Sequence, residues 1–148
     1  MFIQLVDNNK FYASVLTELL HNAGFKSTRY ASGGNEFISK VVTREIPDVL
    51  IIDESNCFEG DVDIIKESRN IYPGLTVIVL TGSEMRSNVT SNPEDGSIHF
   101  LAKESVTIES LPELLYTIFT NKIGRVKKTP RSRVFSLLRK PLAEMLNF

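Results

Sequence analysis

Four short apolar runs, each ending at a polar residue, dominate the hydrophobic pattern of this chain. The runs cover Phe2–Asp7, Pro47–Asp53, Thr76–Thr81 and Ile98–Lys103. Mostly apolar runs of this length are typical of buried strands, as in a parallel sheet. Segments with helical spacing separate them, and such alternation predicts an α/β fold in which right-handed crossovers place helices on both faces of the sheet.

The segments between the runs predict about five helices and one further strand. The expected helices cover residues 9–23, a stretch after Ser32, residues 60–70 and a stretch after Ser110, and the extra strand covers residues 25–30. Asn8 or Asn9, Ser32 and Ser110 are the expected N-caps, the last in a capping box with Glu113. The first helix has an apolar stripe of Phe11, Val15, Leu16, Leu19 and Leu20. Residues 83–97 are rich in Ser, Asn, Pro and Gly, so we expect at most one or two helical turns near residues 84–90.

The polar residues that end the apolar runs are the candidate site. Because the carboxyl ends of parallel strands meet at one edge of a sheet, where open α/β folds bind ligands, these residues should share one shallow pocket. They are Asp7, Asn8, Asp53, Thr81 and Lys103. Read singly, Asp53 could be a structural carboxylate and Lys103 its surface partner. Their combination with Thr81 favours a functional site.

This constellation resembles the receiver domain of bacterial response regulators, in which an aspartate accepts a phosphoryl group from a histidine kinase. The resemblance covers about residues 1–120 and implies a doubly wound, five-stranded parallel sheet of the flavodoxin-like, receiver topology. By resemblance, Asp53 is the phosphoacceptor, Thr81 is the switch hydroxyl and Lys103 contacts the phosphoryl group. Phe100 matches the aromatic switch position on the last strand.

The same resemblance implies a magnesium site at the acidic end of the pocket. Its expected protein ligands are Asp7, Asn8, Asp53 and the backbone carbonyl of Ser55. Asn8 stands where the family has a second acidic residue, and its amide brings no negative charge, so we expect weak binding of Mg²⁺. Glu54 is expected to point to the opposite side of the strand, which would make it a poor substitute.

The predicted function is that of a two-component response regulator. Asp53 accepts a phosphoryl group from a histidine kinase or phosphotransfer protein, and output passes to a downstream protein by protein–protein interaction. The alternative is a degenerate pseudo-receiver that acts as a binding scaffold without phosphorylation. We expect no enzyme activity beyond self-phosphorylation and self-dephosphorylation, and the lack of a Gly-rich phosphate loop after the first strand argues against a flavodoxin-like enzyme.

Composition and charge predict where the protein is located in the cell and indicate a second region of the chain. Hydrophobic and charged contents of 42% and 24% are ordinary for a soluble domain. No apolar run is long enough to span a bilayer, and the opening residues do not resemble a signal peptide, so a cytoplasmic location is expected.

Cys57 is the only cysteine, which rules out an internal disulfide. Residues 1–120 carry 9 Lys+Arg against 17 Asp+Glu, whereas residues 121–148 carry 8 against one.

This asymmetry divides the chain into a receiver domain, residues 1–121, and a basic amphipathic tail, residues 122–148. Basic amphipathic segments bind acidic protein grooves, membrane surfaces or nucleic acid. For this tail we favour folding back on the acidic body or self-association as a homodimer, with contact to an acidic protein or a membrane surface as the alternatives. It is too short for a helix-turn-helix domain, so specific DNA binding is not expected.

Overall fold

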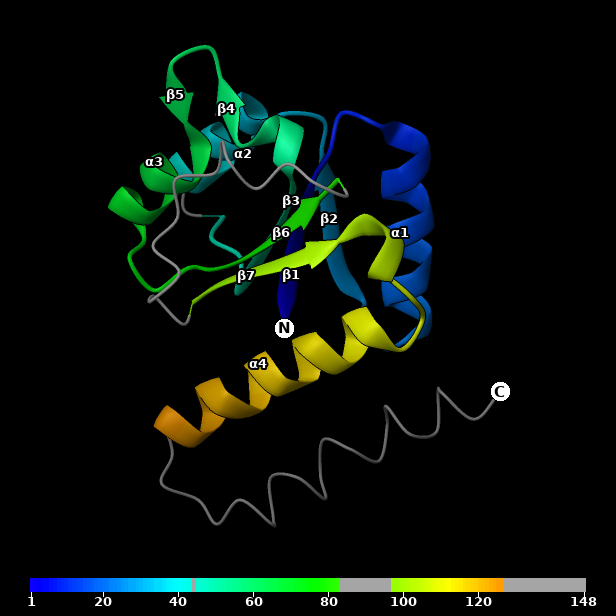
Figure 1. Cartoon of the computed structure of the whole chain (residues 1–148). Helices are drawn as coiled ribbons and strands as arrows, with labels where there is room; N and C mark the ends of the chain where they lie inside the picture. Colours follow the sequence, from blue (N-terminus) through cyan, green and yellow to red (C-terminus); the bar gives the residue numbers. More distant parts are fainter. Residues whose placement is uncertain (44, 83–96, 127–148) are drawn as a thin grey trace.

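A computed structural model contains the expected five-stranded parallel sheet (Figure 1). It describes residues 1–43, 45–82 and 97–126, with side chains as far as residue 121. The strands are β1 (Phe2–Val6), β2 (Ser27–Ala31), β3 (Val49–Asp53), β6 (Thr76–Thr81) and β7 (Ile98–Ala102). Their order is β2-β1-β3-β6-β7, and every neighbouring pair is parallel. The predicted fold class is therefore confirmed, and the two central strands β3 and β6 are buried at every position.

Within the described residues, four helices cover the sheet in two layers. They are α1 (Lys10–Asn22), α2 (Gly34–Val42), α3 (Ile64–Ile71) and α4 (Ser110–Val126). Helices α1 and α4 pack on one face, where Leu16 and Leu115 share a core with Leu5 and Ile51. Helices α2 and α3 pack on the other face, where the second core contains the following buried residues: Val6, Phe37, Leu50, Ile52, Ile64, Val77 and Val79. Successive strand residues point to opposite faces, so each strand contributes to both cores.

The expected stripe of the first helix was partly wrong. Leu16 and Leu20 are buried, but Phe11 is 79% exposed and Val15 is 45% exposed. The buried face of α1 is formed by Ala13, Leu16 and Leu20, and with about 100° of rotation per residue Phe11 and Val15 lie away from this face. Two large apolar side chains therefore lie on the surface of α1.

The prediction of a helix from residue 60 was also wrong. An antiparallel hairpin of β4 (Phe58–Glu59) and β5 (Val62–Asp63) precedes α3. Gly60 lies in its turn with a φ of 61°, a left-handed conformation that favours glycine. Asp63 caps the helix by accepting from the Lys66 amide at 3.1 Å, so α3 begins only at Ile64.

Two of the three predicted N-caps differ in detail. Asn9 caps α1 through a 3.1 Å bond from the Tyr12 amide, as expected. Gly33 rather than Ser32 is the N-cap of α2, and Ser32 instead donates its amide and hydroxyl to Glu36. The Ser110 hydroxyl donates to the carbonyl of Ser105 and does not form the expected capping box, because α4 already begins at this residue.

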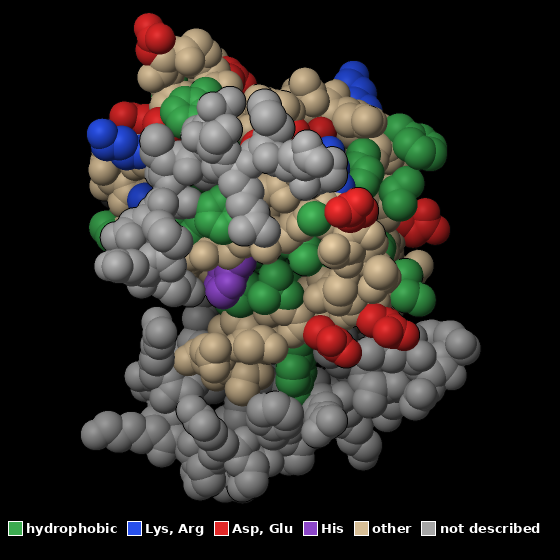
Figure 2. All heavy atoms as spheres, in the orientation of Figure 1, with side chains coloured by type: hydrophobic (Ala, Val, Ile, Leu, Met, Phe, Trp, Pro, Cys, Tyr) green, Lys and Arg blue, Asp and Glu red, His purple; other side chains and the backbone are tan. Residues whose placement is uncertain are grey.

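Short 3-10 helices follow two of the strands, and they carry site residues. Helix η1 (Glu54–Asn56) follows β3, and η2 (Lys103–Ser105) follows β7. Acidic side chains lie over the β4–β5 hairpin and near the start of α4 on the face seen in Figure 2. Among the described helices, none is both long and apolar enough to cross a lipid bilayer.

Helix α4 continues to Val126, past the expected domain boundary at residue 121. The remainder of the predicted basic tail, residues 127–148, and the helical turns expected near residues 84–90 lie outside the described residues.

Candidate functional site

Asp53 is held at the carboxyl end of β3 by the turn that follows it. Its carboxylate is 8% exposed. Oδ2 accepts from the backbone amide of Ser55 at 2.9 Å and from the Ser55 hydroxyl, so the side chain caps η1. The cap fixes the carboxylate at the edge of the sheet and leaves its other oxygen, Oδ1, to face the end of β7.

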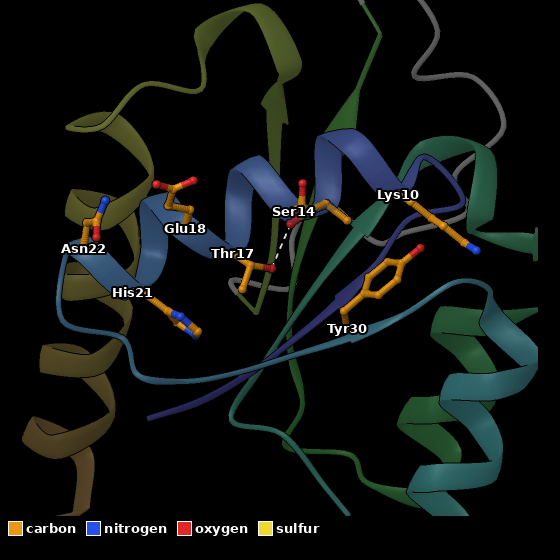
Figure 3. Close-up of a pocket in the computed structure, with 8 residues that line it drawn as sticks. Lys10, Ser14, Thr17, Glu18, His21, Asn22 and Tyr30 are labelled. Atoms are coloured by element: carbon orange, nitrogen blue, oxygen red, sulfur yellow. Dashed lines mark hydrogen bonds between the residues drawn. The ribbon is translucent and has the colours of Figure 1, made fainter.

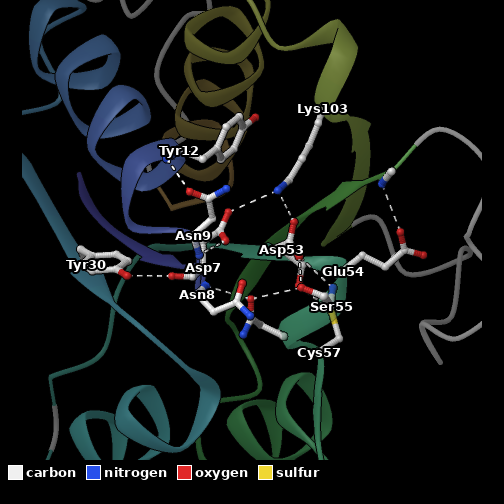
Figure 4. Close-up of polar contacts among 12 residues, drawn as sticks. Asp7, Asn8, Asn9, Tyr12, Tyr30, Asp53, Glu54, Ser55, Cys57 and Lys103 are labelled. Atoms are coloured by element: carbon white, nitrogen blue, oxygen red, sulfur yellow. Dashed lines mark hydrogen bonds and ion pairs between the residues drawn. The ribbon is translucent and has the colours of Figure 1, made fainter.

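Lys103 reaches this carboxylate from the end of β7 (Figure 4). Its Nζ lies 2.5 Å from Oδ1 of Asp53 and 3.4 Å from Oδ2 of Asp7. The ammonium also lies 4.3 Å from the centre of the Tyr12 ring on α1, which is a cation–π distance. Side chains from β3, β7 and the loop after β1 therefore meet at one point, as the topology predicts.

The charges in this cluster stabilise one another. Burial raises the pKa of the Asp53 carboxyl, but the hydrogen bonds from Lys103 and Ser55 outweigh it and hold the pKa below its ordinary value. Burial lowers the pKa of the Lys103 ammonium, and contact with Asp53 and Asp7 more than offsets it, so the net direction is upward. Both shifts favour the charged forms, so Asp53 is an ionised carboxylate and Lys103 a positively charged ammonium at neutral pH.

Asp7 is the second carboxylate of the site and is 4% exposed. Its Oδ1 accepts from the Asn9 amide at 2.8 Å, and Oδ2 faces Lys103. Its backbone carbonyl accepts from the Tyr30 hydroxyl at 2.9 Å. Each of these contacts comes from a different segment, so the orientation of Asp7 depends on the helix cap and on strand β2 together.

Asn8 lies beside Asp7 but is exposed. Its backbone amide donates to Oδ1 of Asn56 at 3.2 Å. Within the described residues, no group of three or more His, Cys, Asp or Glu side chains converges on a single point. The two carboxylates that converge on Lys103 are those of Asp7 and Asp53.

Thr81 and Phe100 occupy the strand positions that the sequence indicated. Thr81 ends β6, is buried, and pairs in register with Ala102, the residue before Lys103. Phe100 pairs with Val79 and packs against the core under α2 and α3. Their switch roles stay predictions.

Sequence reasoning missed several residues that shape the site. Tyr12 stacks on Lys103, Tyr30 supports Asp7, and the buried Asn56 joins the loop after β1 to η1. Tyr12 precedes the buried Leu16 and Leu20 by one and two helical turns, so its phase on α1 could have indicated an inward position. The other two act through contacts between distant segments and leave no local pattern.

Glu54 and Cys57 lie in the turn that follows Asp53. Strand β3 ends at Asp53, so Glu54 begins η1 and does not lie on the opposite face of a strand. Its Oε2 accepts from the Gly82 amide at 3.2 Å. The Cys57 thiol is buried and donates to the Asp53 carbonyl, and burial raises its pKa to about 12, so the thiol keeps its proton and is not a reactive group.

Comparison with known proteins gives the relationship. Chemotaxis protein CheY of Thermotoga maritima is 25% identical over 101 residues, which cover 68% of this chain and 83% of that protein. A response regulator receiver domain protein from Clostridium thermocellum has 25% identity and a TM-score of 0.68, with coverage of 81% of this chain and 94% of that one. In both sequence and fold, the chain is similar to the CheY-like response regulator receiver domains.

Two further comparisons concern the fold and the known protein families. The receiver domain of the hybrid histidine kinase CckA matches the fold with a TM-score of 0.61 at 20% identity, over 80% of this chain and 98% of that one. No protein-family model matches the sequence. The fold is therefore shared with these proteins at low sequence identity.

Proposed function

We propose that this receiver domain acts in two-component signal transduction, with Asp53 as the phosphoacceptor. The observation that carries the proposal is the ionised Asp53 carboxylate, which lies 2.5 Å from Lys103 and shares that ammonium with Asp7. Lysine at this distance offsets the negative charge that a phosphoryl group brings. The similarity to CheY supports the same assignment.

The transfer requires only an ionised oxygen and a phosphohistidine donor. An Oδ of Asp53 attacks the phosphorus, the new O–P bond forms as the P–N bond breaks, and the electron pair of that bond returns to the imidazole, which takes a proton from solvent. Lys103 and the Thr81 hydroxyl then hold oxygens of the phosphoryl group. The donor is a histidine kinase or phosphotransfer protein, and the protein catalyses no reaction beyond gain and loss of its own phosphoryl group.

The donor set of the site fits magnesium. Oxygens of Asp7 and Asp53 converge on a single cation, the Lys103 ammonium, and Mg²⁺ prefers hard oxygen ligands of this kind. Asp7, Asp53, the Ser55 carbonyl and the Asn8 amide would hold the ion. Bound there, it would neutralise charge on the transferred group. Asn8 adds no charge, so the affinity should be low.

The proposal is tested by intact-mass measurement after incubation with acetyl phosphate and millimolar magnesium chloride. We expect one phosphoryl adduct on the wild-type chain and none on Asp53→Asn, because asparagine has no ionised oxygen. Asp61→Asn is the matched control, since Asp61 is an exposed aspartate in the β4–β5 hairpin. It should carry the adduct as the wild type does.

A second candidate function is a pseudo-receiver scaffold that binds a partner without phosphorylation. The observation that favours it is the ion pair itself, because Lys103 already neutralises part of the acidic pair where a metal would bind. Absence of an adduct from the wild-type chain under these conditions would favour the scaffold.

A further inference from the structure

Glu54 makes an unusual contact beside the proposed phosphoacceptor. Its side chain leaves η1 and crosses to the end of β6, where Oε2 accepts from the Gly82 amide at 3.2 Å (Figure 4). Oε1 is buried and has no hydrogen-bond partner among the described residues. A buried carboxylate oxygen without a partner is unfavourable, so this position holds an anion at a local free-energy cost.

The Gly82 amide lies at the edge where the phosphoryl group would be. Asp53 pairs in register with Leu80, and Gly82 follows Thr81, the last residue of β6. The amide is thus a fixed hydrogen-bond donor one residue beyond the proposed switch hydroxyl. Backbone amides at such positions hold oxyanions well, because they need no reorganisation.

We infer that Glu54 is a built-in competitor for the phosphoryl group on Asp53. Its carboxylate takes the Gly82 amide that would otherwise bind one oxygen of the transferred group, and this role rests on the proposed function. Two anions cannot share one amide donor, so Glu54 must leave Gly82 when Asp53 is phosphorylated. Glu54 therefore slows phosphoryl transfer and is displaced by it.

The test compares phosphorylation rates of the full chain with acetyl phosphate and magnesium chloride, followed by intact mass. In this reaction an Oδ–P bond forms on Asp53, the acyl O–P bond breaks and acetate leaves. We expect Glu54→Ala to react about tenfold faster than the wild type, because a hydrogen bond to a charged acceptor is worth about that factor. Glu54→Gln should react at an intermediate rate, since its amide keeps an acceptor but loses the charge.

Glu104→Gln is the matched control. Glu104 is an exposed residue next to Lys103, so its replacement removes the same charge from the same edge of the sheet without touching Gly82. Its rate should stay near that of the wild type. An equal gain in the Glu104 and Glu54 variants would mean that general charge repulsion, and not the contact, sets the rate, and would overturn the inference.

A second measurement addresses the contact directly. The Gly82 amide proton should shift upfield in Glu54→Ala but not in Glu104→Gln, because a charged acceptor deshields its donor proton. If the wild type is phosphorylated and the Glu54 variants match it in rate, the inference fails and the proposed function stands. If neither the wild type nor any Glu54 variant is phosphorylated, the proposed function fails and the inference fails with it. An adduct on the Glu54 variants alone would support both.

Discussion

The site at the carboxyl edge of the sheet and the groove between α1 and β2 differ in where their polar side chains find hydrogen-bond and ion-pair partners. At the edge, polar atoms of three distant segments bind one another, as in the contacts of Lys103 with Asp7 and Asp53. The groove has a volume of about 570 Å³ and lies beside Tyr30 (Figure 3). There, the Ser14 and Thr17 hydroxyls donate to carbonyls of their own helix.

This difference shows that a hollow is not by itself the better candidate site. The Ser14 and Thr17 hydroxyls form their hydrogen bonds within a single helix, whereas ionised groups from separate strands converge at the edge, an arrangement that is common at functional sites. Tyr30 belongs to both regions, because its ring lines the groove and its hydroxyl supports Asp7. Substitutions can therefore test whether the two regions are independent.

The largest effect is expected from Lys103→Met, which removes the cation from the edge. Two buried carboxylates would then face each other, and we expect the free energy of unfolding to fall by about 2 kcal/mol, below the usual range for a buried pair because the Lys103 side chain is 31% exposed. Urea denaturation measures the change. Lys10→Met is the matched control in the groove, where an exposed lysine should matter by less than about 0.5 kcal/mol. Equal losses from both variants would contradict the comparison.

The difference in unfolding free energy between the wild type and Lys103→Met should depend on pH, and the direction of the dependence follows from the pKa of Asp53. The folded pKa of Asp53 is lowered, so the stability from this contact is present above the ordinary aspartate range, near about 4, and is lost as the pH falls through the folded pKa. The difference in unfolding free energy between the wild type and Lys103→Met should therefore be largest near neutral pH and shrink in acid.

A smaller effect is expected from Tyr12→Leu, which keeps an apolar side chain but removes the ring under Lys103. A cation–π contact of this kind is worth about 0.5 to 1 kcal/mol, and the loss should vanish in the Lys103→Met background. A double-mutant cycle in urea measures this coupling energy. Tyr12→Phe keeps the ring and should retain the coupling, so a coupling lost in that variant would assign the effect to the hydroxyl instead.

The comparison also explains what the sequence could predict. The ends of β3 and β6 were predictable because these strands are buried at every position and form apolar runs. The end of β7 was predictable because its mostly apolar run stops at Lys103. Once the strands are parallel, their last residues must share an edge, so the meeting of Asp53 with Lys103 followed from topology. The strand ends and the shared edge could be predicted because many residues contribute to the same hydrophobic pattern.

The parts that were missed depend on single contacts. The β4–β5 hairpin has strands of two residues each, too short for a periodic pattern. Gly60 marks its turn, but one glycine is also compatible with the start of a helix. Glu54 bonds to Gly82 across 28 positions of sequence, and no local preference encodes a partner at that distance.

The smallest effect is expected from Tyr30→Phe, which separates the two regions most sharply. Phenylalanine keeps the ring that lines the groove and removes only the hydroxyl that donates to the Asp7 carbonyl at 2.9 Å. Burial and the nearby charges of Asp7 and Glu36 raise the pKa of this hydroxyl, so it keeps its proton well above neutral pH. We expect a loss of about 0.5 kcal/mol in the free energy of unfolding, at the low end for a hydrogen bond because the group is near solvent.

Backbone amide shifts would show where this small loss acts. In Tyr30→Phe, the signals of Asp7, Asn8 and Asn9 should move, while those of Ser14 and Thr17 across the groove should stay, because their hydroxyl contacts lie within α1. Ser14→Ala is the reciprocal control and should leave the Asp7 signal in place. Shifts that spread along α1 in Tyr30→Phe would mean that the groove and the edge respond as one unit, and that a ligand in the groove could alter the orientation of Asp7.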